Sequence, residues 1–139
     1  MIILDTNVLS ALMTPALNPS PVRWLDSQAA NLIWTTAVNV FESRGGIRLL
    51  PVGRRRHDLE LALDTLLETD FADRVLPFDH AAAEAAATIS SQRISKGRNI
   101  GPRDTQIAGI AVSRRATLAT RNTRDFNDLD IEVIDPWEA

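Results

Sequence analysis

Short apolar runs alternate with segments of helical spacing along nearly the whole of this 139-residue chain. The apolar runs have the length and composition of buried strands and cover 2–4, 32–34, 74–78, 116–120 and 131–134. Helices are predicted from Val8, from Pro21, over 37–50, over 54–69, from about 80 to 95 and over 103–114. Such alternation is typical of a parallel sheet covered on both faces. We therefore predict one α/β/α domain over 1–139, with a mostly parallel central sheet of about five strands.

Local signals set the expected ends of these elements. Thr6 or Asn7 is expected to cap the first helix, and Pro21 to occupy the first position of the second. Asp79 has the position of an N-cap, and Pro77 places the preceding strand at an edge of the sheet. The helix over 37–50 is expected to bury an apolar stripe of Val38, Phe41 and Leu49.

Composition excludes several classes of function. The chain has no cysteine, so it has neither a disulfide nor a thiolate zinc site. Its formal net charge of −3 is not that of a protein that coats nucleic acid, so any nucleic-acid contact should be local. No apolar run is long enough to span a bilayer, and no signal peptide is recognisable. We expect a cytoplasmic protein without a membrane partner.

Acidic and amide residues follow the predicted strands at the end where ligands bind in open α/β sheets. Asp5 comes directly after the first strand, and Asn122 and Asp125 follow the strand over 116–120. Asp104 lies in the first turn of its helix, and Glu42 follows the second strand. Carboxylate oxygens are the ligands that Mg²⁺ and Mn²⁺ prefer. The pattern favours a hydrolase that uses a metal-activated water.

Each of these residues also has a purely structural interpretation. Asp5 and Asp104 have the positions of helix caps, and Glu42 that of a solvated surface residue. A phosphatase of the haloacid-dehalogenase type also places an Asp after its first strand, but it needs a second Asp where this chain has Asn7. A phospho-receiver domain needs an acid pair and a phospho-accepting Asp that we do not find.

Three basic features remain open between structural and binding roles. The basic cluster Arg54–His57 is either a solvated helix end or a contact for phosphate or a partner. Arg103 and Arg121 flank Asp104 and Asn122, where they either contact substrate phosphate or neutralise the neighbouring acids.

Segments spread over the chain resemble PIN-domain toxins of the VapC family, including the FitB-like branch. They are Ile2–Val8, Thr36–Val38 with Glu42, Gly46-Ile47, Leu76–Asp79, Asp104–Ala108, Ala119–Phe126 and Val133–Trp137. The resemblance implies a PIN-like α/β/α sandwich and an endoribonuclease dependent on Mg²⁺ or Mn²⁺. It also implies the toxin role in a type II toxin–antitoxin system, an RNA substrate, a VapB-like antitoxin partner and a homodimer.

By position, the resemblance makes Asp5, Glu42 and Asp104 the metal-binding acids of the site. The fourth position falls on Asn122, which brings an oxygen but no charge, and Asp125 is the alternative for it. This departure leaves a second interpretation open, in which the chain is a catalytically degenerate PIN domain that binds RNA or protein.

Overall fold

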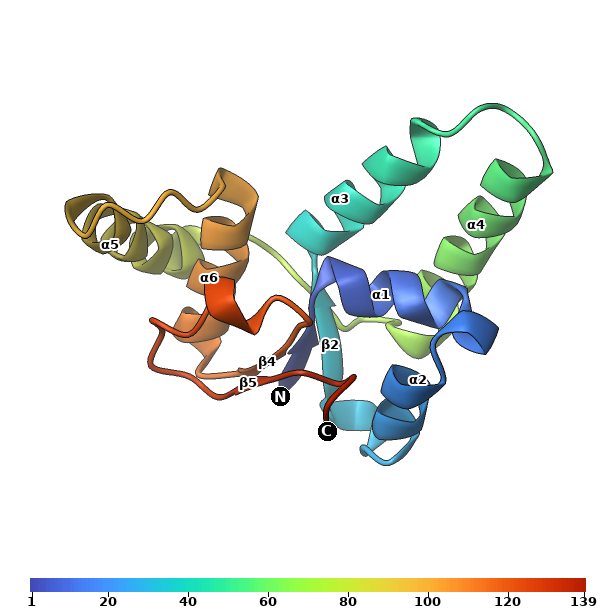
Figure 1. Cartoon of the computed structure of the whole chain (residues 1–139), viewed down its shortest axis with the longest axis horizontal. Helices are drawn as coiled ribbons and strands as arrows, with labels where there is room; N and C mark the ends of the chain where they lie inside the picture. The colour runs from blue at the N-terminus through green and yellow to red at the C-terminus, as the bar shows by residue number, and fades with distance from the viewer.

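A five-stranded parallel sheet forms the centre of the computed structural model, which covers residues 1–139 (Figure 1). Its strands are β1 (Ile2–Leu4), β2 (Ile33–Thr36), β3 (Val75–Leu76), β4 (Thr117–Ala119) and β5 (Val133–Ile134). The order across the sheet is β3-β2-β1-β4-β5, and every neighbouring pair is parallel. The predicted α/β architecture is confirmed, and β3 lies at an edge as Pro77 indicated.

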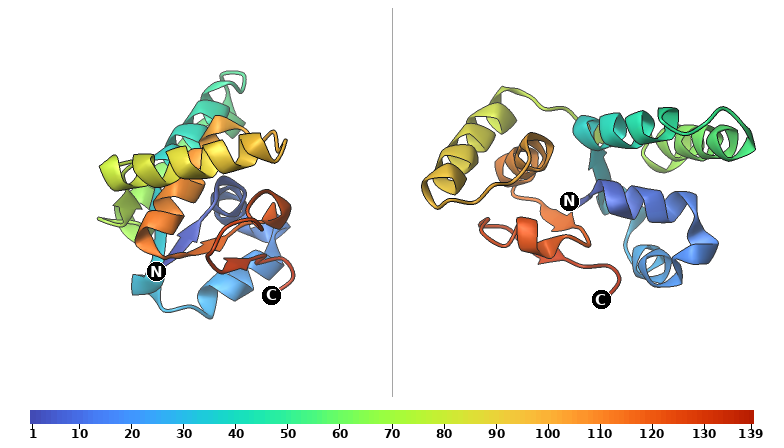
Figure 2. Two further views of the ribbon diagram at one scale, coloured as in Figure 1. Left: turned by 90° about the vertical axis from the view of Figure 1, so that its left-hand side faces the viewer. Right: turned by 45° about the horizontal axis from the view of Figure 1, so that its top comes forward.

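Helices flank the sheet in two groups, which the views of Figure 2 separate. The long helices are α1 (Thr6–Met13), α2 (Pro19–Asp26), α3 (Ala37–Arg48), α4 (Arg54–Thr65), α5 (His80–Ser95) and α6 (Pro102–Arg114). Shorter turns are η1 (Pro15–Leu17), η2 (Ala30–Leu32), η4 (Thr123–Asp125) and the π-helical η3 (Leu66–Asp70). None of the helices combines the length and apolar character needed to cross a membrane.

Two apolar clusters bury the two faces of the sheet. Ile3 and Leu118 pack with residues of α5 and α6, including Ala82 and Ile107. Their chain neighbours Leu4 and Ala119 face the other way, and pack with Val8 and Leu9 of α1 and with Phe71. Successive strand residues point to opposite faces, so a strand buried on both sides has no polar position. This is why β1 consists of apolar residues alone.

Helices α5 and α6 approach each other so closely that Gly109 of α6 has no room for a side chain. A Cβ on Gly109 would lie 2.5 Å from the carbonyl oxygen of Ala82 and 2.7 Å from the Cβ of Ala86, both on α5. Alanines on one helix and a glycine on the other therefore set the spacing of this layer. Helix α5 begins as predicted, because the side chain of Asp79 accepts a hydrogen bond from the backbone N–H of Ala82.

The starts of the first two helices differ from the predictions. Helix α1 begins at Thr6 and its N-cap is Asp5, whose carboxylate accepts from the N–H of Thr6, so neither Thr6 nor Asn7 is the cap. Helix α2 begins at Pro19, and Pro21 lies inside its first turn as a buried residue. Proline lacks a backbone N–H, which costs nothing in a first turn, so either proline satisfies the same rule.

The predicted apolar stripe of α3 was partly wrong. Val38 is buried, but the side chain of Phe41 is 66% exposed and that of Leu49 is 88% exposed. The buried face instead includes Asn39, Ser43 and Ile47, spaced four residues apart. At about 100° per residue, Phe41 lies on nearly the opposite side of the helix from Asn39 and Ser43. A polar residue therefore takes the inward position that the pattern assigned to an apolar one.

Candidate active site

The carboxyl ends of β1 and β4 meet where the direction of strand addition reverses. The chain adds β2 and β3 on one side of β1, and then returns to add β4 and β5 on the other. In open α/β sheets, ligands bind beyond the carboxyl ends of the strands at such a reversal. Asp5 directly follows β1 and Thr120 directly follows β4, so both lie at this point.

Asp5 is a buried carboxylate held by three donors. Its Oδ1 accepts from the backbone N–H of Thr6 at 2.8 Å and from the side-chain amide of Asn39 at 3.1 Å. Its Oδ2 accepts from the hydroxyl of Thr120 at 2.7 Å. The pKa of Asp5 is raised, because burial outweighs these hydrogen bonds and the charge of Asp125 acts in the same direction as burial. The carboxylate is fixed in orientation while its charge lacks a cationic partner.

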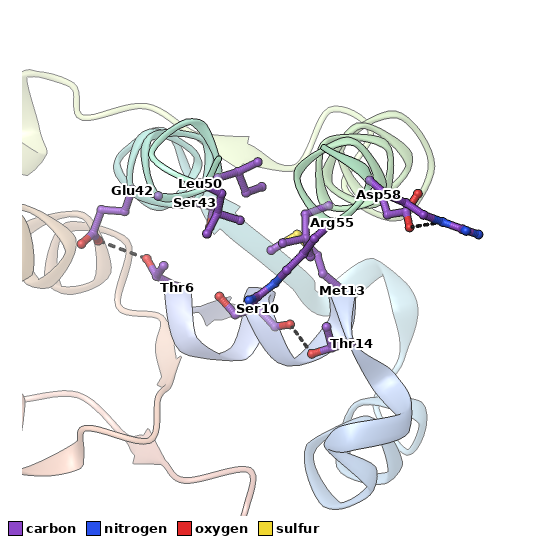
Figure 3. Close-up of a pocket in the computed structure, with 13 residues that line it drawn as sticks. Thr6, Ser10, Met13, Thr14, Glu42, Ser43, Leu50, Arg55 and Asp58 are labelled. Carbon is purple, nitrogen blue, oxygen red and sulfur yellow. Dashed lines mark hydrogen bonds and ion pairs between the residues drawn. The ribbon is translucent and has the colours of Figure 1, made fainter. Parts of the chain in front are cut away.

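Helix α3 supplies both the support for Asp5 and a second acid. Thr36 ends β2 and caps α3, accepting from the N–H of Asn39 at 3.2 Å, while its hydroxyl lies 2.6 Å from the Asn39 side-chain oxygen. This holds the Asn39 amide nitrogen toward Asp5 and toward the hydroxyl oxygen of Thr6, 3.0 Å away. Thr6 in turn donates to Glu42 Oε1 at 3.1 Å (Figure 3). A single hydrogen-bonded chain therefore links Glu42 to Asp5.

Asp104 is the acid of this group whose pKa is raised to about 6. It lies in the first turn of α6, where the helix dipole favours a negative charge. Even so, its pKa is raised, first by burial and then by the charges of Asp5, Glu42 and Asp125, with Arg93 acting in the opposite direction. Four carboxylates from four separate segments therefore act on one another at this edge of the sheet.

Asp125, unlike Asn122, adds a fourth charge to this acid group. Asn122 is exposed, and its backbone N–H donates to the Thr120 hydroxyl at 3.0 Å. Asp125 raises the pKa of both Asp5 and Asp104, so its charge acts directly on the acid pair. Which of Asn122 and Asp125 serves as the fourth donor stays a prediction.

No three acidic or histidine side chains lie close enough together, as they stand, to hold a metal ion. The chemistry of the group nevertheless fits a hard divalent cation. It consists of oxygen donors only, and the mutual repulsion that raises the pKa of Asp104 is what a bound cation would relieve.

Comparison with known proteins identifies the family of this arrangement. The model of the PIN domain matches residues 2–132. The chain belongs to the PIN-domain family.

Full-length relatives of this PIN domain carry names that describe toxins and ribonucleases. It is 38% identical to Toxin FitB of Neisseria gonorrhoeae and 36% identical to VapC ribonuclease Y4jK of Sinorhizobium fredii, and each alignment covers 99% of both chains. The solved structure of FitAcB from Neisseria gonorrhoeae matches with a TM-score of 0.86 and 36% identity, covering 100% of both chains.

A groove of about 780 Å³ lies between α1, α3 and α4 of this PIN domain, and Glu42 is the member of the acid group that lines it (Figure 3). Thr6 and Glu42 line it, and so do Arg54 and Arg55 at the start of α4. The hydroxyl oxygen of Ser43, which also lines the groove, is buried and has no hydrogen-bond partner. Two residues of the basic cluster predicted at Arg54–His57 therefore line the groove.

Three residues that build the site are missed by sequence patterns. Asn39 and Thr120 hold Asp5, and the buried Arg93 connects Thr105 to the loop that carries Asp125. Thr120 could have been found, because the last residue of a strand beside β1 must lie near Asp5.

Of the two flanking arginines, Arg103 lies 3.8 Å from Glu42, whereas Arg121 stacks on the Trp137 ring at 4.8 Å.

Proposed function

We propose that this PIN domain is an endoribonuclease dependent on Mg²⁺ or Mn²⁺ and the toxin of a toxin–antitoxin pair. The observation that carries the proposal is the gathering of Asp5, Glu42, Asp104 and Asp125 at one edge of the sheet, where burial and then the charges of the other three acids raise the pKa of Asp104. A site of mutually repelling carboxylates is costly in a protein unless a cation or a proton compensates it. The names of Toxin FitB and VapC ribonuclease Y4jK support the same reaction and role.

The residues of the site have distinct roles in this proposal. Asp5, Glu42 and Asp104 hold the ion, with Asp125, or Asn122 in its place, as a fourth donor. When bound, the ion supplies Lewis-acid activation of water and of the phosphodiester. Asn39 and Thr120 fix the Asp5 carboxylate through hydrogen bonds of 3.1 and 2.7 Å, so that Asp5 loses little conformational freedom when it binds the ion.

The proposed partners follow from the relatives. Toxin FitB is 38% identical over 99% of this chain, so we propose a cognate VapB-like antitoxin and a homodimer. The groove between α1, α3 and α4 opens beside Glu42 and Thr6, so any segment bound in it would restrict access to the acid group. We further propose that the protein acts in the cytoplasm, where its RNA substrate is.

Replacement of Asp5 by Asn tests this function. The amide keeps the size of the side chain but removes the charge of the residue that lies deepest in the site. We expect Asp5→Asn to abolish metal-dependent cleavage of total bacterial RNA while thermal unfolding stays cooperative. Glu84→Gln, an exposed acid on α5, is the matched control and should cleave at the wild-type rate. Equal cleavage by Asp5→Asn and the wild type would refute the assignment.

A second candidate function is a degenerate PIN domain that only binds RNA or protein. It is favoured by Asn122 at the fourth position and by the spread of the acids, no three of which lie within reach of one ion. Isothermal titration with Mn²⁺ separates the two candidates. A nuclease should give a heat of Mn²⁺ binding that is lost when Asp104 is replaced. A pure binding module should give no heat of Mn²⁺ binding.

A further inference from the structure

Phe41 is an exposed aromatic residue at the rim of the acid group. It directly precedes Glu42 on α3, and its side chain is 66% exposed. An exposed ring gains little of the free energy that burial gives an aromatic side chain, so the fold does not require it. Among the exposed large apolar residues of the chain, Phe41 is the one that adjoins a carboxylate of the site.

Arg103, on the neighbouring helix α6, lies over one face of this ring and leaves the ring largely exposed. Its guanidinium carbon lies 5.8 Å from the centre of the Phe41 ring, and its Nε lies 3.8 Å from Glu42 Oε2. The Arg103 side chain is 55% exposed, so an ion pair with Glu42 contributes little to stability. A cation in the first turn of a helix also opposes the helix dipole. The position of Arg103 therefore calls for an explanation other than folding.

We propose that Phe41 and Arg103 form a stacking platform for one unpaired nucleobase of the RNA, beside the phosphate that is cleaved. The inference rests on the proposed ribonuclease function. Aromatic rings and guanidinium planes are the two surfaces on which proteins stack unpaired bases. Because Arg103 lies 5.8 Å from the Phe41 ring and 3.8 Å from Glu42, a base on the platform places its own backbone next to the acid group.

The platform selects single-stranded RNA. In a duplex both faces of each base are covered by neighbouring bases, so an exposed ring has nothing to stack on without disrupting the helix. Stacking tolerates any base and strengthens with the size of its π surface, so the platform favours an unpaired region over a particular sequence. Arg103 adds a positive charge that attracts the flanking phosphate, in a chain whose net charge is −3.

Kinetics of Phe41 variants test the platform on a short single-stranded RNA of randomised sequence. Phe41→Leu keeps an apolar side chain but removes the ring, and should raise KM roughly tenfold to a hundredfold while kcat changes little. Phe41→Trp keeps a stacking surface and should retain the wild-type KM. Leu49→Ala, which removes an 88% exposed apolar side chain from the far end of α3, is the matched control and should also behave as the wild type.

The outcomes separate this inference from the proposed function. Equal KM values for wild type and Phe41→Leu would overturn the platform while leaving the ribonuclease intact. The absence of Asp5-dependent cleavage in the wild type would remove both. Light scattering on each variant addresses the rival role of Phe41 as a contact between two copies of the chain. Conversion of Phe41→Leu to a smaller species, with activity lost in proportion, would overturn the platform in favour of that contact.

Discussion

The buried guanidinium of Arg93 donates a hydrogen bond of 2.7 Å to the main-chain oxygen of Asp125. The same nitrogen, Nη2, also donates to Asp128 Oδ1 at 3.1 Å, while Nε donates to Asp128 Oδ2 at 2.9 Å and Nη1 to the Thr105 hydroxyl at 3.1 Å. Arg93 thereby joins the loop that carries Asp125 to the helix that carries Asp104. The distance between these two acids depends on one side chain from a third element, α5.

Arg93→Met should destabilise the protein by about 3 kcal/mol, because it leaves Asp128 without its main partner and the Asp125 carbonyl without a donor. Arg93→Lys keeps the charge but loses the planar fork, so its stability should lie between that of Met and that of wild type. Urea unfolding measures both. Arg98→Met is the control, since Arg98 is partly exposed and lies 3.4 Å from the same Asp128; it should cost under about 1 kcal/mol.

Removal of the Thr120 hydroxyl should weaken the binding of a divalent ion at Asp5. Thr120→Val keeps the shape of the side chain but deletes the 2.7 Å hydrogen bond to Asp5 Oδ2. Loss of a residue that orients a ligand typically costs roughly tenfold to a hundredfold in metal affinity. Isothermal titration with Mn²⁺ should show a loss in this range. Thr120→Ser restores the hydroxyl and should recover wild-type affinity; a failure to do so would assign the effect to packing.

The acid group should make the metal-free protein less stable as pH rises. The pKa of Asp104 is about 6 in the folded protein against 3.8 for the free side chain, so the folded state binds the proton more tightly. Ionisation therefore costs stability progressively from about pH 4 to just above pH 6, and by a constant amount at higher pH. Melting temperatures of the metal-free protein, measured in the presence of a chelator across this pH range, should fall as the pH rises.

Asp104→Asn removes the ionisable group and isolates its contribution. The variant should melt higher than wild type at about pH 7.5, and this advantage should shrink toward about pH 5 as Asp104 in the wild type becomes protonated. A difference that is the same at both pH values would show that the substitution acts through packing. An advantage that grows at low pH would contradict the sign of the shift.

The contact between α5 and α6 should not tolerate a methyl group at Gly109. Gly109→Ala forces its Cβ to within 2.9 Å of three atoms of α5, two of them backbone, and should cost about 2 kcal/mol or more. Gly45→Ala on α3 meets no atom within 4 Å and should stabilise the helix by roughly 0.5–1 kcal/mol. Thermal unfolding of the two variants should give shifts of opposite sign.

The sequence predicts those parts of the fold that depend on local patterns. Ile2–Leu4 has no polar position and so must be buried on both faces, which places Asp5 at the carboxyl edge of a parallel sheet. The cap at Asp79 depends only on the residues beside it, and the structure confirms it. The α/β/α architecture follows from many such local signals in a row.

Features that depend on distant residues could not be predicted in the same way. An arginine near the end of a helix usually faces solvent, but Arg93 is buried because Asp128, 35 residues later, folds over it. Phe41 was predicted to face inward, yet Asn39 takes the inner face of α3 because its amide binds Asp5, 34 residues earlier. In both cases a polar partner from another element decides which side of the helix is buried.

The hydrogen bond between Thr120 and Asp5 joins residues 115 positions apart, and the loop carrying Asp125 follows later still. Asp5, Glu42 and Asp104 all precede β4 in the sequence. The hydroxyl of Thr120, which fixes Asp5, and the strand that pairs with β1 on this side both come after them. The acid group can therefore assemble only when segments from widely separated parts of the sequence have come together.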